Sequence, residues 1–287
     1  MEKLTFINSR GQSVELGDNA PYILTKLEGM GAITTNIQSQ KAPYQDGETF
    51  IDAVLEPRTP YAEVMILAEN EAEMGYRRRR LTEILNPKLG PGKLRYENGE
   101  IKVEVEAVIE LGPVFPDAGD FKDKMQPAMI NFYCPEPFLK QINDTINEMR
   151  AVVGGFEFPL EITYSFRFEE SGENLIVKNT GDVSVPVLIE FNGPALNPRV
   201  DNLTTGEFVR VNREIPDGGK LIISTEFGNK KVVLVTDDGE VNSMHWLDLE
   251  STFWQLVPGD NLLSYSADSG KEAAVVRIIH RNRFVGV

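Results

Sequence analysis

Few residues of this chain are suited to nucleophilic or metal chemistry. It has one cysteine, Cys134, and two histidines, His245 and His280. A cysteine nucleophile needs a nearby base such as a histidine, which makes Cys134 a candidate for a Cys–His dyad. It ends an apolar strand pattern, however, which favours a buried structural cysteine. Neither histidine belongs to a metal-ligand spacing. The sequence therefore predicts no catalytic residue and no metal site.

Two groups of carboxylates are candidates for chemistry of their own. Glu104 and Glu106 share one face of an alternating strand, and paired carboxylates carry out glycoside hydrolysis. The sequence offers no partner group with which they could act in catalysis, so we predict that this face lies in water. Asp117, Asp120 and Asp123 offer oxygen ligands but lack the glycine and terminal glutamate of an EF-hand loop. Phosphate-binding and dinucleotide-binding patterns are missing from the sequence, so no cofactor is predicted.

Four consecutive arginines are the most concentrated charge in the chain. They fall in a predicted helix over residues 69–85, where four successive residues span most of the circumference. One interpretation is a solvated face with pairs such as Glu73–Arg77. The alternatives are a subunit interface and, less favoured, nucleic-acid binding. The candidate interface residues are Arg77, Arg78, Arg79 and Arg80.

Trp246 is the candidate for ligand binding in the C-terminal half. It follows His245, and an exposed aromatic face there would suit stacking on a sugar ring. Packing in the core is the alternative fate of a tryptophan. Phe253 and Trp254 are neighbours in an extended pattern, where successive side chains point to opposite faces, so one of the two belongs to the core.

The composition indicates a globular protein with an acidic surface. Hydrophobic residues make up 41% and charged residues 25% of the chain, and the net charge is −15. The acidic excess is divided almost evenly between the two halves, so the surface should repel nucleic-acid backbones and anionic membranes. A single cysteine excludes an intrachain disulfide, consistent with assembly in a reducing cytoplasm. Neither a signal peptide nor a membrane-spanning run is predicted.

Short strands and tight turns dominate both halves. In the N-terminal half, strands are expected near residues 4–7, 50–55, 94–110 and 129–134, with Asn98-Gly99 closing a hairpin. In the C-terminal half, residues 185–235 give four short strands separated by turns rich in glycine and asparagine, which indicates an antiparallel sandwich or barrel. A second helix is predicted over residues 138–153, because Leu139, Ile142, Ile146 and Met149 share a helical face.

The domain boundary is expected near residues 150–160. We assign residues 1–155 to an N-terminal domain and residues 156–287 to a C-terminal domain. The predicted fold class is mainly β with a few short helices.

Ordered sequence pieces along the chain resemble the distal tail proteins (Dit) of siphoviruses, the phages and prophages with long non-contractile tails. The pieces of the N-terminal half are Tyr44-Gln45-Asp46-Gly47, Arg58, Leu85-Asn86-Pro87-Lys88, Gly92-Lys93-Leu94-Arg95-Tyr96, Cys134-Pro135-Glu136-Pro137-Phe138 and Gly155-Phe156-Glu157-Phe158-Pro159-Leu160. Those of the C-terminal half are Asn197-Pro198, Asn202 to Glu207, Gly219 to Ile223, Ser251 to Asn261 and Arg283 to Val287.

This resemblance implies an N-terminal domain that forms a six-fold ring and a C-terminal galectin-like β-sandwich. It implies a structural protein at the virion tail tip, a homo-hexamer whose rings can stack. The implied partners are the tail tube protein, a tail-associated fibre or lysin protein and a receptor-binding protein. Genome DNA passes through the ring, without sequence-specific binding. Members with inserted carbohydrate-binding modules exist, and no stretch here is long enough to be one.

Three functions are therefore compared. A tail hub requires a ring oligomer without catalysis, and the ordered motifs favour it. A carbohydrate-binding module for host adhesion requires an exposed aromatic platform, which Ala substitution of Trp246 tests. A glycoside hydrolase requires two carboxylates facing each other across a cleft.

Overall fold

The computed structural model of the chain describes residues 2–31, 33–117, 119, 123–150, 174–270 and 274–287. Two compact units are formed. The first comprises Met1–Ile142 together with the last residues, Phe284–Val287, and the second comprises Asn143–Arg283. Strands dominate both units, which confirms the predicted fold class. No helix in the described ranges has the length and apolar character needed to cross a membrane.

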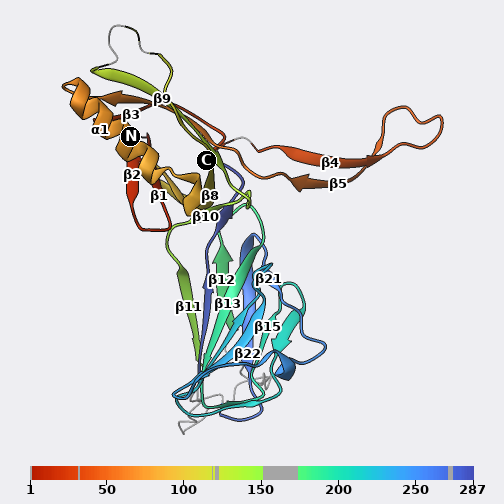
Figure 1. Cartoon of the computed structure of the whole chain (residues 1–287). Helices are drawn as coiled ribbons and strands as arrows, with labels where there is room; N and C mark the ends of the chain where they lie inside the picture. The colour runs from red at the N-terminus through yellow and green to blue at the C-terminus, as the bar shows by residue number, and fades with distance from the viewer. Residues whose placement is uncertain (1, 32, 118, 120–122, 151–173, 271–273) are drawn as a thin grey trace, which may run out of the picture. The chain divides into compact units, whose positions relative to one another are not determined.

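The first unit is built on a nine-stranded sheet (Figure 1). Its main path runs β2-β1-β7-β8-β9-β6-β3 with antiparallel neighbours, while β10 pairs with β8 and with β24. The strands are β1 (Glu2–Ile7), β2 (Ser13–Leu16), β3 (Tyr22–Glu28), β6 (Tyr61–Leu67), β7 (Gly92–Asn98), β8 (Ile101–Val114), β9 (Met125–Tyr133), β10 (Leu139–Gln141) and β24 (Arg283–Phe284).

The hairpin of β7 and β8 forms where the sequence predicted it. Asn98 pairs with Ile101, and Gly99 has a φ of 60°, which a residue without a side chain adopts readily. Apolar residues alternate along both strands, so one face of the sheet is buried.

One α-helix, α1 (Glu71–Ile84), packs on this unit and confirms the predicted helix. Asn70 caps its first turn by accepting a hydrogen bond from the backbone N–H of Glu73. Met74, Leu81 and Ile84 are buried in the core shared with the sheet. The helix ends before Asn86, as expected for a residue that precedes proline, and a 3₁₀ turn follows over η1 (Pro87–Leu89).

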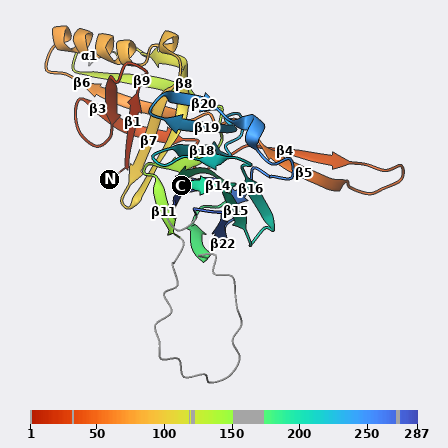
Figure 2. The same cartoon turned by 90° about the horizontal axis from the view of Figure 1, so that it is seen from below.

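A two-stranded hairpin leaves the first unit as a separate sheet, and we call it the arm. It consists of β4 (Thr35–Gln40) and β5 (Thr49–Leu55), paired antiparallel. Figure 1 and Figure 2 both show it extending away from α1. Six extended residues in β4 correspond to about 20 Å of strand.

The second unit contains two main sheets and a small two-stranded one. The larger sheet has the order β11-β23-β13-β18-β19-β20, with β21 added to β13, and the smaller has the order β12-β22-β15-β16. The strands are β11 (Thr145–Arg150), β12 (Asn174–Asn179), β13 (Val185–Asn192), β14 (Ala195–Leu196), β15 (Arg199–Asn202), β16 (Glu207–Arg210), β17 (Glu214–Ile215), β18 (Lys220–Ser224), β19 (Lys231–Thr236), β20 (Gly239–Asn242), β21 (Gln255–Leu256), β22 (Gly259–Ser266) and β23 (Val275–His280). A 3₁₀ turn, η3 (Met244–Trp246), follows β20.

These two sheets face each other as a β-sandwich. Ile189 and Phe191 of the larger sheet and Leu263 and Tyr265 of the smaller one are buried in a single core. The rings of Phe191 and Tyr265 meet at a centroid distance of 6.0 Å. The four strands predicted between residues 185 and 235 are present, which confirms the sandwich prediction.

The predicted helix over residues 138–153 is wrong in its described part. Residues 139–141 form β10 and residues 145–150 form β11. Leu139 belongs to the core of the first unit and Met149 to that of the second. Pairing of β10 with β8 and of β11 with β23 replaces the hydrogen bonds that a helix would have made. Residues 151–153 lie outside the described residues.

The expected domain boundary at residues 155 and 156 stays a prediction. That position lies outside the described residues. The second unit begins at Asn143 because β11 pairs along its whole length with β23. The last four residues return to the first unit, which sequence patterns alone did not indicate.

Candidate functional site

Two of the four candidate arginines, Arg77 and Arg78, interact with other residues of the first unit. The Arg77 guanidinium donates to the carbonyl oxygen of Leu67 and pairs with the Glu73 carboxylate, which confirms the predicted i,i+4 pair. The guanidinium of Arg78 lies 4.5 Å from the ring centre of Phe115. These contacts hold α1 against the sheet and connect it to the segments next to it.

The other two candidate arginines face outward. Arg80 lies 3.3 Å from the Glu83 carboxylate, one turn further along α1. The Arg79 side chain is exposed and forms neither a hydrogen bond nor a close ion pair with any described residue. Within the arginine run, Arg79 is therefore the best placed to meet a partner molecule, and its role in a subunit interface stays a prediction.

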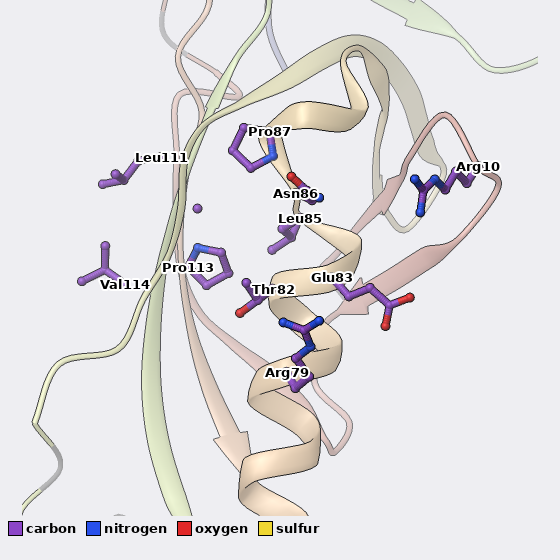
Figure 3. A pocket seen from close by; sticks show the side chains of 11 residues that line it. Arg10, Arg79, Thr82, Glu83, Leu85, Asn86, Pro87, Leu111, Pro113 and Val114 are labelled. Carbon is purple, nitrogen blue, oxygen red and sulfur yellow. The ribbon is translucent and has the colours of Figure 1, made fainter.

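Arg79 lines a pocket of about 650 Å³, which we call the helix-end pocket (Figure 3). The second half of α1 forms one wall, and the end of β8 forms another. Leu111 and Val114, which are 49% and 41% exposed, lie on the side of β8 away from α1 (Figure 3). The lining residues are Arg10, Arg79, Thr82, Glu83, Leu85, Asn86, Pro87, Leu111, Gly112, Pro113 and Val114.

The pocket has a positive local charge. Arg10 and Arg79 contribute two guanidinium groups that form no ion pair with a described residue. The one carboxylate of the lining, Glu83, accepts hydrogen bonds from Gln12 and Arg80, and these interactions lower its pKa. The charge of Arg79 also lowers the pKa of Glu83, so the two guanidinium groups and one carboxylate of the lining leave a net positive charge that attracts an acidic group.

The arm carries an apolar face that nothing described in its own unit covers. Cross-strand pairs place Ile37 opposite Ala53 and Phe50 opposite Ser39, on the same face of the two-stranded sheet. Ile37 and Phe50 are 65% and 64% exposed. The opposite face carries mainly polar side chains and the exposed Val54, while Ile51, which is 59% exposed, is left without a cross-strand partner by the register irregularity. The arm is thus amphipathic in the manner of a strand pair that packs on another surface.

An ordered, acidic tip closes the arm. The Gln45 side chain accepts a hydrogen bond from the Ala42 backbone and donates one to the Thr49 hydroxyl. Tyr44 has a φ of 62° and is fully exposed. Residues 33–57 contain four carboxylates and one lysine, and none of them forms an ion pair with a described residue. A strained, exposed aromatic at an acidic tip is a candidate contact for another molecule.

Cys134 is buried, as predicted, and does not have the properties of a nucleophile. Burial raises the pKa of its thiol to about 12, although the charge of nearby Arg58 opposes this effect. At neutral pH the thiol is therefore protonated and shielded from solvent.

The expectation that Glu104 and Glu106 both lie in water is wrong for Glu104. Glu106 is exposed, but Glu104 is only 7% exposed. Strand β7 places Arg95 directly opposite Glu104, with 3.0 Å between the Arg95 Nε and the carboxylate, and the Lys93 Nζ lies 3.7 Å away. The carboxylate is thus engaged in a structural ion-pair network, and cross-strand register accounts for its burial.

The histidines and the acidic loop show no metal-binding arrangement in the part of the chain that the structure describes. His280 is buried in the sandwich, and His245 is exposed. Asp120, one of the three aspartates considered as oxygen ligands, lies outside the described residues.

Of the two tryptophans, Trp254 is a core residue and Trp246 is half-buried. Trp254 is 1% exposed, in agreement with the prediction that one residue of the Phe253–Trp254 pair packs in the core. Trp246 packs against the same core, with the Arg213 guanidinium 5.0 Å from its ring centre and the His245 ring 5.1 Å away. Its neighbours therefore limit the ring surface open to a sugar, and glycan contact stays a prediction.

Sequence reasoning missed the arm and the pocket as surfaces. It predicted the strand at residues 50–55 and a turn at residues 43–47 but did not pair them with residues 35–40. The signal for the arm is the separation of large apolar residues on one face from polar residues on the other. The sequence does not show this separation by itself, because it depends on the cross-strand register, including the irregularity between Gln38 and Ser39.

Two domain families of phage tails match the chain in consecutive segments. The phage tail protein RIFT-related domain matches residues 9–134, and the C-terminal domain of the siphovirus-type tail component matches residues 180–284. No curated protein sequence matches the chain.

Solved structures of tail proteins share the fold over the whole chain. The crystal structure of the Dit protein of phage SPP1, described as a paradigm of the hub adsorption apparatus in phages infecting Gram-positive bacteria, superimposes with a TM-score of 0.71 at 15% identity, covering 98% of this chain and 99% of that one. A chain of the phage P2 baseplate in its activated conformation with Ca gives a TM-score of 0.56 at 11% identity, covering 100% and 99%. The corresponding Sr structure gives 0.56 at 11% identity, covering 100% of both chains.

The two matching domains follow one another along the chain, and the solved structures share the fold over nearly its whole length. The chain therefore belongs to the siphovirus distal tail (Dit) protein family.

Proposed function

We propose that six copies of this chain form a ring that serves as the hub of the tail tip. In this hub the ring joins the tail tube protein on one side to a tail-associated fibre or lysin protein and a receptor-binding protein on the other. The chain acts as a structural protein without catalysis. The observation that carries the ring is the arm, whose apolar face is exposed in the single chain.

An amphipathic hairpin standing alone in water is unfavourable for two physical reasons. Two-stranded sheets are marginally stable without packing against another element. The exposed side chains of Ile37 and Phe50 also gain free energy when removed from water, about 25 cal/mol for each Å² of apolar area. Both penalties disappear if the arm packs on another protein molecule. A ring requires such head-to-tail contacts between non-identical surfaces of neighbouring copies.

The net charge supports passage of DNA through such a ring. The chain carries 44 acidic and 29 basic side chains, with no basic stretch that could track a phosphate backbone apart from the arginines of α1. Two of those arginines are engaged within the first unit. A predominantly acidic surface repels DNA, so that the genome can move past without binding.

The ring is tested by the mass of the purified full chain in solution, measured by light scattering together with negative-stain images of the same fraction. We expect a particle of six or twelve times the 32.1 kDa of one chain, with a central hole. A protein that stays monomeric up to the highest concentration reached, or forms a two-fold dimer, contradicts the ring.

A further inference from the structure

Both ends of the arm and both connections between the units meet at one buried side chain, that of Arg58. The arm begins after Met30, and the chain returns from it at Arg58. Pro137 lies shortly before the chain enters the second unit, and Val285 shortly after it leaves that unit. The Arg58 guanidinium donates hydrogen bonds to the carbonyl oxygens of all three of these residues and of Gly29.

We propose that these contacts form a conformational junction, through which a displacement of either connection changes the mobility of the arm. Every contact of the junction lies within the first unit of one chain. The inference therefore does not depend on the proposed ring.

The three guanidinium nitrogens are divided between the arm and the connections. The Nε atom lies 3.1 Å from the Pro137 carbonyl oxygen, and one Nη atom lies 2.7 Å and 2.8 Å from those of Gly29 and Met30. The other Nη atom donates to the carbonyl oxygen of Val285. A planar, rigid group that bonds in all these directions moves as one piece, so it links the positions of its acceptors.

Burial makes this set of hydrogen bonds difficult to break singly. Arg58 is 2% exposed, and its guanidinium forms no ion pair with a described residue. A buried N–H group that loses its acceptor cannot turn to water, which makes the loss costly. If Val285 or Pro137 is displaced, the guanidinium therefore follows it and disturbs the carbonyl groups at the start of the arm.

Close backbone packing supports the same coupling. A Cβ atom at Gly31 would lie 3.3 Å from the carbonyl oxygen of Val287, and one at Gly286 would meet the carbonyl of Gly31. Strand β24 also pairs with β10, so the two connections are themselves joined by strand pairing. Closely packed groups have no free space in which one can shift alone, so displacement of the C-terminal residues affects the start of the arm.

Spin labelling of the full chain measures the mobility of the arm near its start. The native Cys134 is 0% exposed, so a nitroxide reagent attaches only to an introduced cysteine. Asn36→Cys places the label at an exposed position of β4, in the second residue pair of the arm. Ala72→Cys places it at an exposed position of α1, where it reports the tumbling of the first unit.

Phe284→Ala loosens the C-terminal connection next to an acceptor of Arg58. Phe284 is half-buried and packs on the core of the first unit, directly before Val285. We expect the rotational correlation time of the nitroxide at position 36 to fall by about twofold, with no change at position 72. An unchanged label at position 36 overturns the junction.

Phe115→Ala is the matched control. Phe115 is also half-buried and packs on the same core, but its ring lies beside Arg78 of α1 and takes no part in the junction. This variant should leave the label at position 36 unchanged. If it mobilises that label as much as Phe284→Ala does, general loosening of the first unit is the cause and the inference is wrong.

Arg58→Lys tests whether the effect passes through the guanidinium. Lysine keeps the positive charge, but one ammonium group cannot reach the same set of carbonyls. We expect this variant to mobilise the label at position 36 by itself, and Phe284→Ala added to it to cause no further change. Additive effects of the two substitutions mean independent routes and contradict the role of Arg58.

The junction can also be tested in the opposite direction without a change at Arg58, because coupling between two sites is reciprocal. Met30→Ala truncates a side chain in the core at the start of the arm, at a residue whose carbonyl Arg58 binds. A nitroxide on Val287→Cys, at a residue that is 38% exposed, should then move about twofold faster. Phe115→Ala is again the control.

The absence of a response at position 287 contradicts the coupling, even if Arg58→Lys fails to fold. Light scattering of the same samples shows separately whether the chain forms a ring. A chain that is not a ring overturns the proposed hub and leaves the junction standing if the labels respond as expected. A ring whose labels do not respond overturns the junction alone.

Discussion

At the scale of single residues, Arg58 is a buried cation of the first unit that needs several hydrogen-bond acceptors. It is 2% exposed, and its guanidinium donates hydrogen bonds to the carbonyl oxygens of Gly29, Met30, Pro137 and Val285. Burial lowers its pKa from the ordinary value. A single buried cation thus ties together three segments that are far apart in the sequence. The planar guanidinium group of arginine has several N–H donors that point in different directions, as these hydrogen bonds require.

Arg58→Ala should destabilise the first unit by about 3 kcal/mol or more, because it leaves several buried carbonyl groups without a donor. Arg58→Lys should recover only part of this loss, since one ammonium group cannot reach the same set of carbonyls. Chemical denaturation measures both variants. Arg79→Ala, at an exposed position, is the control and should change stability by less than about 0.5 kcal/mol. Equal effects at positions 58 and 79 contradict the structural role of Arg58.

His280 should make the stability of the second unit depend on pH. Burial lowers its pKa below the ordinary value of 6.5, although the backbone of Lys178 partly opposes the shift. The folded state therefore favours the neutral imidazole, and the unfolded chain binds the proton more readily. This contribution to stability is complete above about pH 6.5 and is lost as the pH falls below it.

Urea denaturation at about pH 7.5 and about pH 5.5 checks the prediction for His280. His280→Gln should lose less stability between these two pH values than the wild type does. His245→Gln, at an exposed histidine, should show the same pH dependence as the wild type. An unchanged pH dependence in His280→Gln means that other groups are responsible.

At the scale of elements, the close approach of β1 and β7 depends on Gly92. A Cβ atom at this position would lie 2.5 Å from the carbonyl oxygen of Ile7 and 2.8 Å from the ring of Phe6. The clash with backbone cannot be relieved by a side-chain rotation, so the two strands must separate. Gly75 in α1 differs, because nothing lies within 4 Å of a Cβ built there.

The two glycine-to-alanine substitutions should therefore have opposite effects. Gly92→Ala should destabilise the first unit by about 1–3 kcal/mol through strand displacement. Gly75→Ala should stabilise it by up to about 1 kcal/mol, because alanine is the better helix former. Denaturant midpoints of the two variants and the wild type give the comparison. A destabilising Gly75→Ala would show that the space beside α1 is not open.

At the scale of the whole molecule, the chain returns to its first unit at its end. Phe284–Val287 belong to that unit, although the preceding 141 residues of Asn143–Arg283 belong to the other. The carbonyl of Val285 receives a hydrogen bond from Arg58, and Gly286 lies so close to Gly31 that a Cβ atom would meet its carbonyl oxygen. Folding of the first unit is therefore completed by residues distant in sequence.

Removing residues 284–287 should weaken the first unit and leave the second unchanged, because the contacts described above for these residues lie in the first. Hydrogen exchange followed by mass spectrometry should show faster exchange in β6 and β9, with no change in β13 and β18. Removal of Val287 alone, which keeps the Arg58 acceptor, should have a smaller effect. Equal acceleration in both units would show that they unfold as one.

The sequence alone determined the elements whose patterns are local. Asn98-Gly99 predicted its hairpin because the turn type requires those residues, and the spacing of Met74 and Leu81 predicted the buried face of α1. Alternating apolar residues predicted the sandwich strands. The resemblance carried by the ordered family motifs already implied a structural protein of the phage tail.

Tertiary structure decided everything that depends on which segments meet. Leu139 and Met149 share a helical spacing, yet each pairs as a strand in a different unit, since distant partners supply the hydrogen bonds. Glu104 is buried because β7 places Arg95 opposite it. The apolar face of the arm exists only in the register that sets Ile37 and Phe50 on one side. Burial and register are non-local properties, so no window of sequence contains them.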